Sequence, residues 1–320
     1  MFTLILPALL RPDAEHLPEL DTPFLDKLLR FARFDAQPSP LGRLYAEHLA
    51  VDFALPERCV YASPVWQQMG MHSMNLLDGA AVGINEEEAE ALCSGLNEFY
   101  RGQARFRALR PDLWRMLLPA SVDWQAPPVF DVLGQIDGSV RAEGTGAAQW
   151  LQMQTEIQMW LHDHPMNRHR RNHQQPPING IWLWNAPVYP SAAAETAPAL
   201  MGCDSAWAAQ SPLNLAPTPA HFQDWQQYCD NQGVAIGNTA VWLDGLTLSR
   251  QTNDTWAYGD VLAQWDETFF KPLWEALSEK RMDSARIITD GEAGGTLWLQ
   301  KPPLFAWFKA KRHFNGRSLL

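Results

Sequence analysis

The residues best suited to chemistry lie in one segment, residues 156–185, which reads EIQMWLHDHPMNRHRRNHQQPPINGIWLWN. Four of the nine histidines of the chain fall between residues 162 and 173, together with three arginines. Imidazole can bind a metal or transfer protons near neutral pH, and guanidinium groups bind phosphate or carboxylate. This segment is therefore the first candidate for a binding site or an active site.

The spacing of these residues leaves three interpretations open. His162 and His164 are two residues apart at an expected helix end, so their side chains diverge by about 200° if the last turn stays helical. This spacing favours a metal site less than the i,i+4 pair of an HExxH motif does. In the first interpretation His164 caps the helix and its polar neighbours bind loop backbone. The second is a small-anion or polar-ligand site at His162, Asn167 and Arg170, and the third is a metal site.

Three expected elements position the segment. Residues 148–164 have the apolar periodicity of a helix, which Pro165 should end. A polar loop should follow, and residues 180–184 (GIWLW) are typical of a buried strand. A helix end, a loop and a strand start thereby meet, which is a common way to build a site.

The same segment resembles the signature of a bacterial family of RpfE-type regulatory proteins, also described as phosphoglycerate-mutase-like proteins. The family pattern is L-H-x-H-P-x-N-x-x-R followed by P-x-N-x-x-W-x-W. The resemblance covers residues 55–210 and implies ligand-binding roles for residues that match the pattern. These are His162, His164, Asn167, Arg170, Asn179, Trp182 and Trp184.

The mutases to which this family is similar use two divalent metal ions, held by Asp and His residues that begin with an Asp after the first strand. Here the first expected strand leads into PALLRP, and Asp13 comes later. We therefore favour a non-catalytic or weakly catalytic regulatory protein that binds a small anionic ligand or a protein partner without a cofactor. One alternative is a phosphoglycerate mutase or phosphatase holding Mn²⁺ or Zn²⁺ at His72, Asp78, His162 and His164. The other is a pure protein-interaction module.

Composition excludes several other classes. The net charge of −11 repels nucleic acid and anionic membrane surfaces, so neither is expected as a partner. No apolar run is long enough to span a membrane, and the N-terminal segment lacks the basic region of a signal peptide. The four cysteines contain no CxxC pair, which predicts separate reduced thiols in a cytoplasmic protein.

Helical and strand patterns alternate along the chain. They predict an α/β fold, or a mixed α+β fold, with a central mixed sheet and flanking helices. A capping box at Asn85 and Glu88 should open a helix over residues 86–100. Hairpins are expected at 106–118 and 285–301, a strand pair at 233–248, an irregular connection at 185–217 and a helix kinked at Pro272. The Pro- and Gly-rich residues 119–147 suggest an N-terminal α/β region over 1–145 and a C-terminal region over 146–320, unless the chain is one domain.

Overall fold

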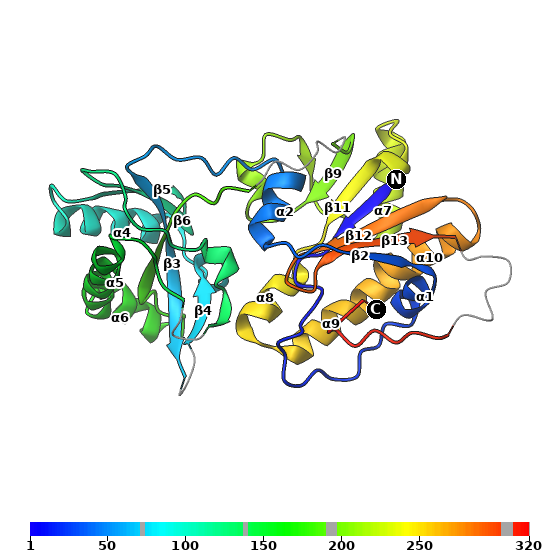
Figure 1. Ribbon diagram of the computed structural model, residues 1–320, viewed down its shortest axis with the longest axis horizontal. Helices are drawn as coiled ribbons and strands as arrows, with labels where there is room; N and C mark the ends of the chain where they lie inside the picture. The colour runs from blue at the N-terminus through cyan, green and yellow to red at the C-terminus, as the bar shows by residue number, and fades with distance from the viewer. Residues whose placement is uncertain (71–73, 137–139, 190–196, 302–309, 320) are drawn as a thin grey trace. The chain divides into compact units, whose positions relative to one another are not determined.

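The chain forms two compact units, and the sequence of one is inserted within the sequence of the other. The computed structural model describes residues 1–70, 74–136, 140–189, 197–301 and 310–319. Unit 1 comprises Met1–Asp52 and Pro190–Leu320, and unit 2 comprises Phe53–Tyr189. The α/β class is confirmed, but each unit has its own sheet (Figure 1). The boundary expected between residues 145 and 146 falls inside unit 2.

Unit 1 is built on a mixed seven-stranded sheet. In spatial order the strands are β10 (Leu215–Ala216), β9 (Leu200–Cys203), β11 (Thr239–Trp242), β1 (Phe2–Ile5), β12 (Ser284–Thr289), β13 (Gly295–Gln300) and β2 (Arg33–Ala36). The first five neighbouring strands are parallel; β13 pairs antiparallel with the last of them, and β2 pairs antiparallel with β13. Almost every residue of β1, β11 and β12 is buried, as expected for strands in the middle of a parallel sheet.

Helices cover the apolar face of this sheet. Phe2, Leu4, Val241, Ile287 and Leu297 belong to one core with residues of α1 (Pro23–Phe31), α7 (Phe222–Asn231), α9 (Thr255–Trp265) and α10 (Lys271–Ser278). A single π-helical turn, Asp266–Phe270, separates α9 from α10 at the kink expected near Pro272. On the other face, Tyr45 of α2 (Leu41–His48) stacks on Trp242 with ring centroids 5.3 Å apart.

Unit 2 is built on an antiparallel sheet. Its strands run in the order β5 (Arg105–Arg110), β6 (Leu113–Leu117), β3 (Cys59–Met69), β4 (Met74–Asp78) and β7 (Gly134–Ile136), and β8 (Gly180–Trp184) also pairs with β3. The helices include α4 (Glu86–Phe99), α5 (Ala147–His162) and α6 (Pro165–Asn172) (Figure 1). The capping box at Asn85 and Glu88 is present, because each side chain accepts from the other residue's backbone N–H.

Several sequence predictions are confirmed and others are wrong. The hairpins β5–β6 and β12–β13, the strand β8 and the four unpaired cysteines are as expected. The strand pair at 233–248 is wrong, since β11 pairs with distant β1 and β9, and residues 245–252 form helix α8 (Gly245–Thr252). The connection at 185–217 contains β9 and β10 and is not irregular throughout. None of the described helices is long and apolar enough to cross a bilayer.

Candidate functional site

The first part of the motif is helical where a loop was expected. Helix α5 ends at His162, and Pro165 opens α6 at its first position, where its missing N–H is not needed. His164 is the N-cap of α6, and its Nδ1 accepts a hydrogen bond from the Met166 N–H at 3.3 Å. Burial, and then the charge of Arg168, lower the pKa of His164, which favours the neutral ring that this acceptor role requires. The histidine caps the start of the second helix and not the end of the first.

Arg170 and Asn167 fasten α6 to other parts of unit 2. The Asn167 Nδ2 donates to the carbonyls of Leu161 and Ile178, and its Oδ1 accepts from the Ile178 N–H. The Arg170 side chain is 1% exposed, and all three of its nitrogens donate within the unit: to Glu88 Oε2 at 2.6 Å, to Val82 O at 2.6 Å and to Pro176 O at 2.7 Å. The structure uses both side chains to hold the fold.

The second part of the motif also faces the protein interior. The side chain of Asn179 pairs with both the N–H and the carbonyl of Gln67, at 2.7 and 2.8 Å, which extends the contact between β8 and β3. Trp182 is buried and donates to Pro127 O, and Trp184 is buried and donates to the hydroxyl of Ser63. Of the seven motif residues predicted to bind ligand, only His162 is classed as exposed.

Two of the four residues named for a metal centre have other roles in the structure. The Asp78 carboxylate accepts from the Ala81 N–H at 2.9 Å and caps a short helix, and the Nδ1 of His164 is already an acceptor. His72 lies outside the described residues. Over the described ranges, no three His, Cys, Asp or Glu side chains converge on a point that could hold an ion.

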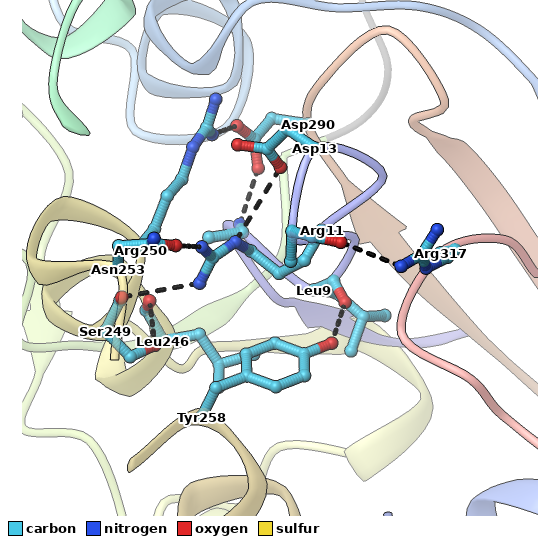
Figure 2. Close-up of polar contacts among 12 residues, drawn as sticks. Leu9, Arg11, Asp13, Leu246, Ser249, Arg250, Asn253, Tyr258, Asp290 and Arg317 are labelled. Atoms are coloured by element: carbon cyan, nitrogen blue, oxygen red, sulfur yellow. Dashed lines mark hydrogen bonds and ion pairs between the residues drawn. The ribbon is translucent and has the colours of Figure 1, made fainter. Parts of the chain in front are cut away.

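A second polar cluster lies in unit 1, at the carboxyl ends of three neighbouring parallel strands. Ligands of open α/β sheets bind at this edge. Figure 2 shows this cluster, which we call the strand-end cluster. Its members are Arg11 and Asp13 in the segment after β1, Arg250 in α8, Asn253 directly after α8, and Asp290 directly after β12. These residues come from three distant stretches of sequence and meet because β1 lies between β11 and β12.

The carboxylate of Asp290 organises the cluster. It is buried, and its Oδ1 accepts from the Ala8 N–H at 2.6 Å while its Oδ2 binds Arg250 Nη1 at 2.9 Å. Ala8 has a φ of 59°, a left-handed conformation that is uncommon for a residue with a Cβ. The Asp290 bond holds the loop after β1 in this turn, and Leu9 O accepts from the Tyr258 hydroxyl at 2.6 Å (Figure 2).

Arg11 lies deep in the same cluster. Its Nη2 donates to Asn253 Oδ1 at 2.8 Å and its Nη1 to Ser249 O at 3.3 Å, and its side chain is 1% exposed. The Nε is buried without a hydrogen-bond partner, since the nearest carboxylate, that of the largely exposed Asp13, is 3.8 Å away. Burial, opposed by Asp13, lowers the pKa of the guanidinium, which still remains a cation. The Arg11 Nε is therefore a buried donor without a hydrogen bond, in a cluster where Arg250 pairs with the buried Asp290.

The amino-acid pattern alone does not single out these residues. Asp290 was expected only as part of a hairpin turn, and Arg11 only as part of a segment lacking an early aspartate. An Asp directly after the buried run of β12 is a recognisable signal, but its meaning depends on knowing that β1 and β12 are parallel neighbours.

No protein-family model and no curated protein matches the chain. The solved structures that are similar at low identity include the following two. The PH0037 protein from Pyrococcus horikoshii is 13% identical, with 95% of this chain and 88% of that chain covered and a TM-score of 0.46. A cofactor-independent phosphoglycerate mutase from Thermoplasma acidophilum DSM 1728 is 12% identical, with 97% and 95% covered and a TM-score of 0.37. Function must therefore be inferred from the residues of the site.

Proposed function

We propose that the protein binds a small anionic ligand at the strand-end cluster and acts as a non-catalytic or weakly catalytic regulatory protein. The ligand would carry a phosphate or carboxylate group. The observation that carries the proposal is the buried Nε of Arg11, which has no hydrogen-bond acceptor and only the exposed Asp13 carboxylate at 3.8 Å. An unsatisfied buried donor costs about 1–3 kcal/mol, and more when the group is charged. An anion oxygen within reach would remove that cost.

The exposure of Arg250 and the occupied oxygens of Asp290 support an anion over a cation. Arg250 is 36% exposed, so its guanidinium can contact a ligand while Nη1 keeps its bond to Asp290. Asp290 has both oxygens engaged, which leaves it poorly suited to bind a metal. The resemblance of residues 161–184 to RpfE-type proteins supports the regulatory part of the proposal.

Ligand-dependent stabilisation tests the proposal. Inorganic phosphate and citrate are the probes, and urea unfolding of the full chain is the measurement. A ligand at one hundred times its Kd should raise the free energy of unfolding by about 2.7 kcal/mol. Arg250→Gln should lose this increment, whereas Arg281→Gln, which removes a half-exposed arginine elsewhere in unit 1, should keep it. Equal increments in both variants, or none in the wild type, would overturn the proposal.

The mutase or phosphatase alternative has a separate test. Turnover of 3-phosphoglycerate by the protein with Mn²⁺ or Zn²⁺ would contradict a non-catalytic role. If turnover occurs and Arg250→Gln abolishes it, the strand-end cluster would be an active site and not only a binding site.

A further inference from the structure

Three arginines share one face of the hairpin in unit 2. Arg107 of β5 lies directly opposite Arg115 of β6, and Arg105 lies opposite Leu117. Opposite residues of an antiparallel pair point to the same face, and residues two apart along a strand do so too. The intervening side chains of Phe106 and Met116 are buried on the other face. Arg105, Arg107, Arg115 and Leu117 are here called the arginine face.

The arginine face carries uncompensated positive charge. Over the described part of the chain, none of its three guanidinium groups forms an ion pair. Like charges directly opposite each other on a sheet are destabilising, yet Arg107 and Arg115 are paired in this way. These three arginines belong to a chain whose net charge is −11. Such a cost is offset when an anionic partner covers the charges.

A cavity continues the arginine face at one end. It has a volume of about 570 Å³ and lies between the end of α4 and the hairpin. Arg58, Arg101 and Arg105 line it together with the apolar side chains of Leu117 and Pro119. Leu117 is 42% exposed, so the surface combines cationic groups with an apolar contact.

The edge of the sheet beside this face is closed to an added strand. The Asn97 side chain of α4 accepts from the Phe106 N–H and donates to the Phe106 carbonyl, at 2.6 and 3.0 Å. The thiol of Cys93, one turn earlier, hydrogen-bonds the backbone of Ala108. Helix α4 therefore occupies the outward backbone groups of β5, a common protection of edge strands. A partner would have to bind through the side chains of the face.

We propose that the arginine face and its cavity dock an acidic segment of a partner protein. Carboxylates would bind Arg105, Arg107 and Arg115, and apolar side chains of the segment would pack on Leu117 and Pro119. Arginine suits this role because its planar fork binds carboxylates in a bidentate manner. Nucleic acid is less well matched, since single strands are held by aromatic stacking and the lining side chains include no aromatic ring.

Fluorescence anisotropy with the full chain tests the proposal. The probe is a labelled peptide that repeats Glu-Glu-Leu, and its control repeats Gln-Gln-Leu. Reversing the charge at two exposed positions with Arg105→Glu and Arg107→Glu should weaken binding of the acidic probe by about tenfold or more. The matched control, Arg141→Glu with Arg171→Glu, makes the same change in net charge at exposed positions of unit 2 off the arginine face and should change binding by less than about threefold.

Several results would overturn the proposal. These are absence of binding to the wild type, equal weakening by the two double variants, and equal binding of the acidic and Gln-containing probes. Tighter binding of a single-stranded DNA oligonucleotide, lost in the Arg105/Arg107 variant, would assign the face to nucleic acid. Self-association that this variant abolishes would assign it to a second copy of the chain. A urea midpoint within the range of the control variant shows that the double variant is folded.

Discussion

Replacing Arg170 separates a structural role from a ligand-binding role for the motif. Arg170→Ala removes three hydrogen bonds: the carbonyls of Val82 and Pro176 lose their side-chain donor, and the Glu88 carboxylate loses its ion-pair partner. Breaking a buried charged pair by removing one partner typically costs about 3–5 kcal/mol. Because Glu88 keeps its contact with the Asn85 N–H and some exposure to water, we expect a value near the lower end, about 3 kcal/mol.

Urea unfolding followed by tryptophan fluorescence measures this loss. Arg171→Ala is the matched control, because it removes the neighbouring exposed arginine and should change the free energy of unfolding by less than about 0.5 kcal/mol. Arg170→Lys should recover only part of the loss, since an ammonium group cannot reach three acceptors in the geometry of a guanidinium. A cost below about 1 kcal/mol for Arg170→Ala, accompanied by loss of phosphate-dependent stabilisation, would refute the structural role and restore the ligand-binding interpretation.

Three further predictions concern protonation. The pKa of His164 is lowered, so its contribution to stability should be complete above pH 6.5 and lost as the pH falls below this value. NMR titration should give a pKa under 6.5. The variant His164→Asn keeps a capping oxygen and should flatten this part of the stability profile. Burial raises the pKa of Asp266, so the folded state takes up a proton more readily than the unfolded state does. The free energy of unfolding should therefore fall as the pH rises from about 3.8 through the raised pKa. Urea unfolding from about pH 4 to 7 tests this, and an unchanged slope in Asp266→Asn would contradict it. Burial raises the pKa of Cys93 and Cys203 to about 12, so neither thiol should react with a disulfide reagent at pH 8 until the protein is unfolded. Fast labelling of either cysteine in the native chain would disprove this prediction.

The local elements were largely predictable from the sequence because their signals are local. The capping box at Asn85 and Glu88, the turn between β12 and β13 and the apolar stripe of α5 each need only neighbouring residues. Pro165 shows the limit of such reasoning. A proline ends one helix and can equally open another, and the second outcome depended on the His164 side chain acting as a cap.

The strand-end cluster was not predictable in the same way. Its members, among them Arg11 and Asp290, are brought together by the parallel pairing of β1 with β12, between residues more than 280 positions apart. Nothing in the amino-acid pattern of β1 specifies which distant strand it will join. The motif residues, by contrast, were visible in sequence, but the pattern alone could not show that the polar groups of Asn167 and Arg170 bind the protein itself.

The insertion of unit 2 has a consequence for how the chain folds during synthesis. Unit 2 is continuous in sequence, so all of its strands are available once residue 189 has left the ribosome. The central strand of unit 1 is synthesised first, yet its neighbours β11 and β12 follow more than 230 residues later. Strand pairs of such separation form slowly, because a long loop must close before any contact compensates for it. The apolar residues of β1 therefore remain without their native partners throughout the synthesis of unit 2, and this is the interval in which the nascent chain most needs protection from aggregation.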